Sequence, residues 1–256
     1  MNRLNVIKVG GKIVEEEDSL RQLLSDFSAM PGEKVLVHGG GRSATRIAAM
    51  LGVETQMVNG RRITDEDMLR VVTMVYGGLV NKNIVAGLQK LGVNALGLTG
   101  ADMNVILSHK RPVKDVDYGF VGDVDRVDGE RLAELIRSGV VPVMAPLTHD
   151  AEGHMLNTNA DTIAAETAKA LAPFFDVTLT FCFEKPGVLR DENDDESVIS
   201  SVNEQEFRML VRDGVVQGGM IPKIENAFSA IHHGVGRVVI TQASALGKQA
   251  GTVIVK

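Results

Sequence analysis

The sequence has very few of the residues that build disulfide frameworks, cysteine-based zinc sites or aromatic-rich surfaces. Its 256 residues include one cysteine, Cys182, and no tryptophan, and aromatic residues make up 4% of the chain. A single cysteine cannot form an intrachain disulfide, and this usage is typical of a reducing compartment. Cys182 lies in the apolar run 179–183, which favours a buried core thiol over a reactive one. We therefore predict a cytoplasmic protein.

An excess of basic residues and a long apolar run are also absent. The chain has 27 Lys and Arg against 33 Asp and Glu, a formal net charge of −6, so it lacks the basic surface that neutralises nucleic-acid phosphates. No apolar run approaches the roughly 20 residues that span a bilayer. With 44% apolar and 23% charged residues, the composition is that of an ordinary globular enzyme. We predict small-molecule partners, and neither a nucleic acid nor a membrane.

The common nucleotide-binding signatures are missing as well. No G-x-x-x-x-G-K-[ST] segment occurs, because Gly11-Lys12 is followed by Ile13 and Gly247-Lys248 by Gln249. Neither a G-x-G-x-x-G segment after a predicted strand nor a protein-kinase signature is present. The six histidines show no metal-ligand spacing such as H-E-x-x-H. We therefore assign no metal ligands and expect the histidines to be structural or exposed.

The chain does contain short β-branched runs that alternate with helical patterns, which indicates an α/β fold with a mainly parallel sheet. Strands are expected at 5–9, 34–38, 93–98, 140–145, 176–183, 237–241 and 252–255. The turn-rich segment 102–127 is expected to form β-hairpins that cover a site as a lid. Pro173 breaks the helix before it, so we divide the chain into lobes 1–172 and 173–256.

Two predicted strands end in glycine clusters, Gly10-Gly11 and 39–41. Glycine allows backbone N–H groups to approach a ligand closely, and the start of a following helix favours anionic oxygens. Either cluster alone is equally consistent with a tight turn. Because both follow strands of one parallel sheet, they favour an anion-binding site at its carboxyl edge.

Three polar segments carry further candidate site residues. The segment 157–161 reads Asn-Thr-Asn-Ala-Asp and opens a helix, which needs only one of these residues as a cap. In the segment 218–223, Lys223 follows a glycine turn at a helix start, where the helix dipole disfavours a cation unless an anion binds there. After the Asn59-Gly60 turn signal, one of two consecutive arginines could clamp a carboxylate bidentately. Each residue could also be a solvated surface residue.

Taken in order, these segments resemble the amino acid kinase family, and within it the kinases that act on N-acylglutamates. The segments are KVGG at 8–11, HGGG at 38–41, NGRRIT at 59–64, NTNAD at 157–161 and GGMIPK at 218–223. The last two are the most specific, and the resemblance covers nearly the whole chain. It implies a three-layer αβα sandwich with a mainly parallel central sheet, in which the N-terminal lobe binds the acyl amino acid and the C-terminal lobe binds ATP.

The resemblance also implies the reaction and its site. A kinase of this kind phosphorylates the side-chain carboxylate of an N-acyl-L-glutamate with ATP and Mg²⁺, in arginine biosynthesis. The implied catalytic residues are Lys8, Lys223 and Asp161. The implied substrate-binding residues are Gly40, Gly41, Arg62, Asn157, Asn159 and Arg42. The implied phosphate-binding glycines are Gly10, Gly11 and Gly219, and Glu184, Lys185 and Gly187 are implied on the nucleotide side.

Two departures from the family pattern carry further hypotheses. Arg42 stands where family members commonly carry an uncharged residue, so it could bind the second carboxylate of an N-succinyl group in preference to N-acetyl. Alternatively, it points into solvent or pairs with a surface acid. The segment 184–187 replaces the usual Asp-Val-Pro-Gly, which affects the expected ATP contacts.

The resemblance also bears on assembly. The chain starts almost at its first strand and lacks the helix that links dimers of arginine-inhibited members into hexamers, so we expect an arginine-insensitive homodimer. The apolar stripe of Met68, Val71, Val72 and Val75 is either its interface or ordinary core. Two other functions stay open. One is another carboxylate or carbamate kinase of the family, and the other is a non-catalytic regulatory protein on the same fold.

Overall fold

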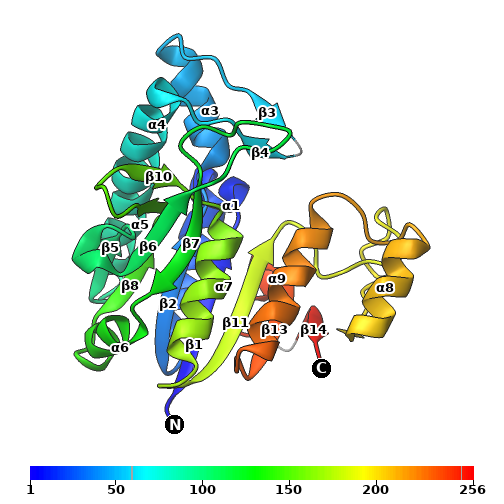
Figure 1. Ribbon diagram of the computed structural model, residues 1–256. Coiled ribbons are helices and arrows are strands. Elements are labelled where there is room, and N and C mark those ends of the chain that lie inside the picture. The colour runs from blue at the N-terminus through cyan, green and yellow to red at the C-terminus, as the bar shows by residue number, and fades with distance from the viewer. Residues whose placement is uncertain (59, 249) are drawn as a thin grey trace.

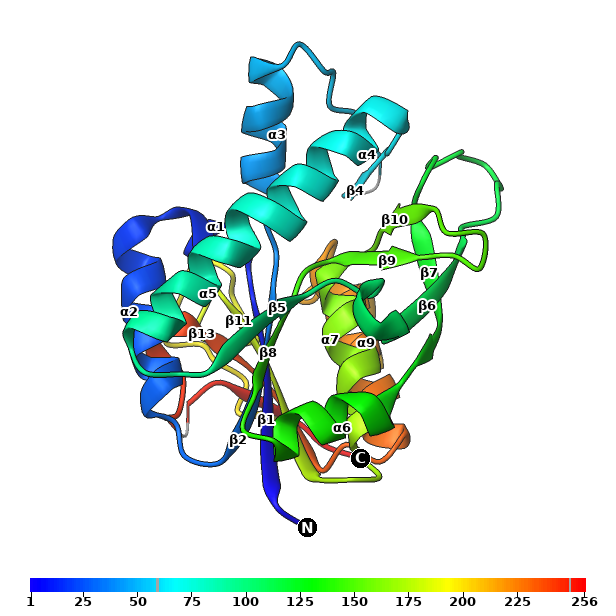
Figure 2. The ribbon, with the colours of Figure 1, turned by 90° about the vertical axis from the view of Figure 1, so that its left-hand side faces the viewer.

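The computed structural model describes residues 1–58, 60–248 and 250–256. Asn59, the first residue of the predicted Asn59-Gly60 turn, lies outside the described residues. The elements form three layers, with helices on both faces of a central sheet (Figures 1 and 2). The predicted αβα sandwich is therefore confirmed.

The central sheet has eight strands in the order β12-β14-β13-β11-β1-β2-β8-β5. These strands are β1 (Arg3–Val9), β2 (Glu33–His38), β5 (Ala95–Leu98), β8 (Val141–Met144), β11 (Asp176–Phe183), β12 (Ser201–Val202), β13 (Arg237–Gln242) and β14 (Thr252–Ile254). All neighbouring pairs are parallel except β13 with β14. In the register, Lys8 of β1 lies between Phe181 of β11 and Val37 of β2. The carboxyl ends of these three strands therefore meet at one edge.

Helices cover both faces of the sheet because each carries one apolar face. On one side lie α1 (Gly11–Glu15), α2 (Glu17–Ala29), α3 (Gly41–Met50), α4 (Glu66–Val72), the π-helical turn η1 (Thr73–Val80) and α5 (Asn81–Lys90). On the other side lie α6 (Gly129–Arg137), α7 (Ala160–Leu171), α8 (Glu204–Arg212) and α9 (Met220–His232). Figure 2 shows α2 and α5 on one side of the strands and α6, α7 and α9 on the other. Each side has its own apolar core.

A smaller sheet stands above the carboxyl edge of the main one, in the order β10-β9-β6-β7. Its strands are β6 (Ile106–Lys110), β7 (Gly122–Val127), β9 (Leu147–His149) and β10 (Met155–Asn157), and the hairpin β3 (Met57–Val58) with β4 (Arg61–Arg62) lies nearby. Two short 3₁₀ turns, η2 (Asp102–Asn104) and η3 (Ala243–Ala245), complete the elements. The β6–β7 hairpin is antiparallel, so the hairpin predicted within 102–127 is confirmed.

The loop of this hairpin is tied to the segment after β4. The Thr64 N–H donates to the Tyr118 carbonyl (3.0 Å), and the Phe120 N–H donates to the Thr64 carbonyl (2.7 Å). Between them, Gly119 has a φ of +68°, and a Cβ there would collide with the Thr64 carbonyl. Only glycine meets both requirements. The lid is therefore anchored beside Arg62.

The predicted lobe boundary at Pro173 falls between α7 and β11. Strands from both sides of it, β1 and β2 before and β11 and β13 after, join the same sheet. The two lobes therefore share one continuous sheet, and β1 and β11 pair along its middle.

The segment Glu66–Lys90 forms one helix of 25 residues. By its length and composition alone, this helix could cross a membrane. However, 44% of its most apolar window is buried inside the protein, and its buried side chains belong to the apolar core on one side of the sheet. The apolar stripe of Met68, Val71, Val72 and Val75 is at most 2% exposed. These side chains cannot reach a partner subunit, so the hypothesis that they form a dimer interface is wrong. Their helix packs them against the sheet instead.

Candidate active site

The two glycine clusters converge at the carboxyl edge of the main sheet. The Gly39 N–H donates to the Val9 carbonyl (3.1 Å), which joins the end of β2 to the end of β1. A Cβ on Gly11 would lie 3.6 Å from the nitrogens of both Gly40 and Gly41. Because Gly40 and Gly41 begin helix α3, their N–H groups have no intrahelical partner. The clusters thus place unpaired amide donors next to one another.

A buried carboxylate beside these glycines holds two lysines. The Lys8 Nζ lies 2.7 Å from Asp161 Oδ1, and the Lys223 Nζ lies 3.5 Å from Asp161 Oδ2. Burial raises the pKa of Asp161, but the two ammonium groups more than offset this and hold it below its usual value of 3.8. Asp161 is therefore ionised, and the trio carries one net positive charge. It brings together the ends of β1, α7 and α9.

Local capping explains where these side chains lie. The Asn159 side chain accepts the N–H groups of Asp161 (2.7 Å) and Thr162 (3.3 Å), so it begins helix α7 and orients Asp161 on its first turn. Lys223 donates to the Gly219 carbonyl (3.4 Å) and lies over the Phe183 ring at 5.9 Å. A Cβ on Gly219 would meet nothing within 4 Å. Gly219 therefore borders open space at the start of α9.

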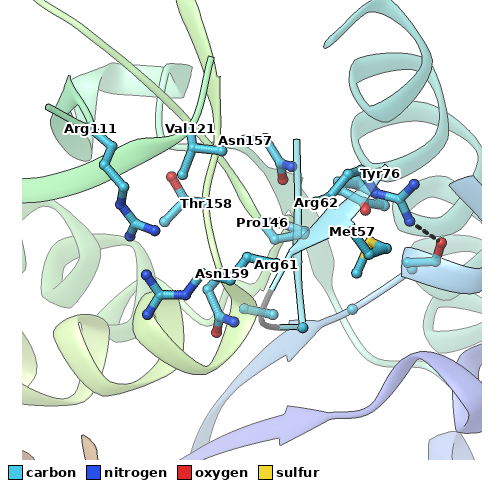
Figure 3. Close-up of a pocket in the computed structure, with 15 residues that line it drawn as sticks. Met57, Arg61, Arg62, Tyr76, Arg111, Val121, Pro146, Asn157, Thr158 and Asn159 are labelled. Carbon is cyan, nitrogen blue, oxygen red and sulfur yellow. Dashed lines mark hydrogen bonds between the residues drawn. The ribbon is translucent and has the colours of Figure 1, made fainter. Parts of the chain in front are cut away.

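A cavity of about 220 Å³ opens next to the glycine loop (Figure 3). Five predicted substrate-binding residues line it, namely Gly40, Gly41, Arg62, Asn157 and Asn159. Asn157 donates to the Thr64 hydroxyl (2.9 Å), which connects the cavity wall to the lid anchor. The Tyr76 ring packs against the glycine loop, because a Cβ on Gly40 would lie 2.9 Å from that ring. The predicted substrate residues, Arg42 excepted, are thus brought together.

Arg62 is the most informative residue of this cavity. It is only 8% exposed, and its guanidinium donates to the Gly41 carbonyl (2.8 Å) and the Thr45 hydroxyl (2.8 Å). Within the described part of the chain, Arg62 has no ion pair with a carboxylate. A buried cation without an anionic partner is costly. The cavity therefore suits a ligand that brings a carboxylate.

Two further arginines line the opposite wall: Arg61, the other member of the predicted arginine pair, and Arg111, which the sequence did not indicate. Arg111 on the lid forms an ion pair with Asp123, and its hydrogen bonds hold the pKa of Asp123 below 3.8. The Arg111 Nη1 atom is buried and has no hydrogen-bond partner. Figure 3 shows Arg61 and Arg111 on the same side of the cavity, away from Arg62. Nothing in the sequence around Arg111 distinguishes it from a surface arginine.

Arg42 does not line the cavity. Its guanidinium is 62% exposed and lies 3.4 Å from the Glu184 carboxylate, which also pairs with Lys12 at 3.3 Å. The predicted contact between Arg42 and the acyl group is therefore not supported. The alternative, pairing with a surface acid, is what the structure contains, because the end of β11 places Glu184 within reach of α3.

A second cavity of about 590 Å³ lies on the C-terminal side, within the size range of small-molecule sites. Lys185 and Gly187 line it together with Met220, three residues before Lys223, but Glu184 does not. Lys185 is held by Asp195 (3.0 Å) and by the Glu192 carbonyl (3.0 Å). Two of the three nucleotide-side residues thus border a cavity of suitable size.

One group of potential metal ligands occurs among the described residues, in the turn between β9 and β10. It comprises Asp150, Glu152 and His154. The Asp150 carboxylate already accepts N–H groups from Glu152 (3.1 Å) and His154 (2.8 Å). It is therefore accounted for by the geometry of the turn.

Comparison with known proteins agrees with this geometry. The model of the amino acid kinase family matches residues 3–242. The chain belongs to the amino acid kinase family. Two relatives named acetylglutamate kinase are very similar. One, from Phocaeicola vulgatus, is 72% identical over 254 residues, which are 99% of each chain. The other, from Bacteroides thetaiotaomicron, is 73% identical over 254 residues, again 99% of each chain.

A solved structure supports the same fold. The crystal structure of the Streptococcus mutans protein smu.665 superposes with a TM-score of 0.82 at 29% identity, covering 98% of each chain. The family and fold predicted from the glycine, NTNAD and GGMIPK segments are therefore confirmed, as is a kinase with a carboxyl group as acceptor. In this amino acid kinase, the two lysines, their shared carboxylate and the glycine loops occupy one edge of the sheet.

Proposed function

We propose that this protein transfers the γ-phosphoryl group of ATP to the side-chain carboxylate of an N-acyl-L-glutamate. The observation that carries the proposal is the Lys8–Asp161–Lys223 trio next to a cavity lined by Arg62, which has no carboxylate partner among the described residues. The names of the similar relatives support the same activity. The product is an acyl phosphate, an intermediate suited to arginine biosynthesis.

The residues of the site fit the demands of phosphoryl transfer, which needs positioning and charge stabilisation more than covalent catalysis. An oxygen of the substrate carboxylate attacks the γ-phosphorus, and the bond to the β-phosphate oxygen breaks to release ADP. The attacking carboxylate is already ionised, so no general base is needed. Lys8 and Lys223 neutralise charge on the transferring group, and the amides of the glycine loops donate to its oxygens.

Asp161 serves as an anchor in this proposal, because both of its oxygens are engaged by the lysines. The two ammonium groups hold the pKa of Asp161 below its usual value, which disfavours its protonation. We infer that Mg²⁺ would enter with ATP, and that its charge would offset that of the phosphates.

The cavity orients the acyl amino acid. Arg62 supplies a buried guanidinium for the α-carboxylate, and Asn157 and Asn159 present side-chain amides for the acyl amide. The nucleotide occupies the larger cavity beside Lys185 and Gly187. In this arrangement lobe 1–172 binds the acyl substrate and lobe 173–256 binds ATP, and the phosphoryl group passes between them.

The acyl group can be inferred from the opposite wall. N-acetylglutamate carries two carboxylates, one for Arg62 and one that accepts the phosphoryl group, and its acetyl group is neutral. Arg61 and Arg111 would then face no carboxylate of the substrate. The buried Arg111 Nη1 atom would remain without a hydrogen-bond partner. An N-succinyl group would supply a third carboxylate at this wall. We therefore propose Arg111, in place of Arg42, as the residue that favours N-succinyl-L-glutamate.

We also propose that the enzyme is a cytoplasmic homodimer that is insensitive to arginine. The buried stripe cannot form its interface, but Met74 and Leu79 of the same long helix are 54% and 46% exposed. Exposed large apolar side chains of this kind are frequent in subunit interfaces. Light scattering in the presence and absence of arginine tests the expected dimer, and a hexamer would contradict it.

One assay tests the proposed activity. ADP release is measured with ATP and Mg²⁺ on N-acetyl-L-glutamate, N-succinyl-L-glutamate, L-aspartate and carbamate, with Lys8→Met as the inactive control. Turnover is expected only with the N-acylglutamates. Turnover with carbamate or aspartate alone would indicate another kinase of the family. Ligand binding without any ADP release would favour a regulatory protein.

A further inference from the structure

His38 is a fully buried polar residue that the proposed reaction does not yet use. It ends strand β2, directly before the glycine loop, and its exposed fraction is 0%. Burial lowers its pKa to about 4, with a smaller contribution from the nearby charge of Lys82. The ring is therefore neutral at physiological pH. One of its nitrogens carries a proton and the other accepts.

A neighbouring amide decides which nitrogen carries the proton. Asn81 Nδ2 donates to the Val143 carbonyl (2.9 Å) and lies 3.1 Å from His38 Nε2. Asn81 Oδ1 accepts from Lys82 Nζ (3.1 Å), so the amide orientation is fixed by both of its ends. Because an amide NH₂ group only donates, Nε2 must accept. The proton is then on Nδ1, which lies 2.7 Å from the Gly39 carbonyl oxygen and donates to it.

This hydrogen bond fixes the plane of the Gly39–Gly40 peptide. The described chain contains no cis peptide bond, and in a trans peptide the C=O and N–H bonds point in opposite directions. The carbonyl points to His38 in the core, so the Gly40 N–H points the opposite way, away from His38. A Cβ on Gly11 would lie 3.6 Å from the Gly40 nitrogen, so this amide lies beside the other glycine cluster. A glycine peptide has little other resistance to rotation.

We propose that His38 is a positioning residue for phosphoryl transfer. By holding the Gly39 carbonyl, it aims the Gly40 N–H at the transferring group, and Asn81 keeps its ring in the required tautomer. This proposal rests on the function proposed above. Preorganised donors of this kind act mainly in the transition state. Loss of the Nδ1 donor should therefore lower kcat more than it changes KM.

Two isosteric substitutions separate positioning from simple packing. In His38→Asn, the side-chain NH₂ can replace Nδ1–H and still donate to the Gly39 carbonyl. In His38→Gln, the amide can replace Nε2 and still meet Asn81, but it leaves the Gly39 carbonyl without a donor. We expect kcat to fall by roughly 10–100-fold in His38→Gln and by less than about fivefold in His38→Asn. The KM values for both substrates should change by less than about threefold.

Three outcomes of this comparison overturn the proposal. They are equal losses of kcat in both variants, a greater loss in His38→Asn, and unchanged kcat in both. Thermal melting of each variant is measured alongside, and a kcat difference that merely follows the melting temperature also counts against positioning.

A measurement on the unmodified protein keeps the proposal testable if the variants do not fold. Nitrogen NMR of the histidine rings in the wild-type protein reports the tautomer of His38 directly. The Nδ1–H form of a buried histidine is expected from pH 6 to 8, and an Nε2–H form or a protonated ring in that range would overturn the proposal. This readout is independent of turnover. Absence of ADP release from the unmodified enzyme would instead contradict the proposed function.

Discussion

The Lys8 ammonium group lies 2.7 Å from a carboxylate oxygen of Asp161, and both side chains are about nine-tenths buried. Lys223 shares the second oxygen of the same carboxylate. Asp161→Asn keeps the shape but removes the charge that holds two cations together. We expect kcat to fall by about 10²–10³-fold, since both lysines lose their anchor. Steady-state ADP release measures this loss.

Glu166→Gln is the matched control, because Glu166 lies on the same helix and pairs with Lys169 (2.8 Å) away from the glycine loops. It should retain kcat within about twofold, as partly exposed pairs contribute little. If Asp161→Asn also retained wild-type kcat, Asp161 would have no role in holding the lysines.

Arg62→Ala should mainly affect the acyl substrate. The buried guanidinium has no anionic partner within the described residues, so a substrate carboxylate gains a charge-assisted hydrogen bond there, worth about 1.5–3 kcal/mol. The KM for the N-acylglutamate should rise roughly 10–100-fold, and the KM for ATP should stay within about twofold. Arg46→Ala, an exposed position of helix α3, is the control and should change neither. A rise confined to the KM for ATP would place Arg62 on the nucleotide side.

Substitution of Arg111 should change the preference between N-succinyl and N-acetyl substrates, whereas substitution of Arg42 should not. Arg111→Gln should raise the KM for N-succinyl-L-glutamate at least tenfold more than the KM for N-acetyl-L-glutamate, since it removes the guanidinium with the unpaired Nη1. Arg42→Gln should change both values by less than about threefold, because its exposed pair with Glu184 contributes little. A selective effect of Arg42→Gln would restore the original hypothesis.

These residues illustrate what could be predicted from the sequence. The glycine loops and Lys223 were predictable because each lies at the end of a strand or the start of a helix, and local pattern determines those positions. The pairing of Lys8 with Asp161 was implied only by the resemblance to the family. The direction of Arg42 depends on Glu184, which is 142 residues away along the chain. No local pattern reports such a contact.

Contacts between distant parts of the chain also explain the other differences between the sequence-based expectations and the structure. Met68 and Val71 would form an apolar stripe whether they lay in a dimer interface or in the core. Only the packing of the long helix on the sheet shows that they are core residues. Arg111 became a site residue because the β6–β7 hairpin folds over the cavity and pairs it with Asp123. The tautomer of His38 depends on Asn81, which lies on another element. Tertiary contacts thus decided the parts that sequence could not predict.

Gly119→Ala should weaken the lid. Its φ of +68° costs an alanine about 1–2 kcal/mol, and its Cβ would also collide with the Thr64 carbonyl that anchors the loop. Gly153→Ala is a matched control, since Gly153 has a φ of +87° but nothing within 4 Å of its Cβ. Urea unfolding should show a larger loss for Gly119→Ala, together with a higher KM for the acyl substrate. Equal losses in the two variants would mean that the Thr64 contact does not matter.

The stability of the protein should depend on pH through His38. His38 has a pKa of about 4 in the folded protein, against 6.5 for an ordinary histidine. As the pH falls from 6.5 to 4, the unfolded chain takes up a proton at this residue that the folded chain does not. The free energy of unfolding should therefore decrease through this window, by about 3 kcal/mol in total. The contribution is fully present above pH 6.5.

The difference between wild type and His38→Asn isolates this effect. Asparagine does not titrate, so the stability difference between the two proteins should change across pH 6.5–4, while contributions from the other histidines cancel. The depressed carboxyl groups of Asp123 and Asp161 have ordinary values near 3.8, so they act below this window. Urea unfolding at half-unit pH steps measures both curves. Parallel curves between pH 6.5 and 4 would mean that His38 titrates normally in the folded protein, and that its ring is not held neutral by burial.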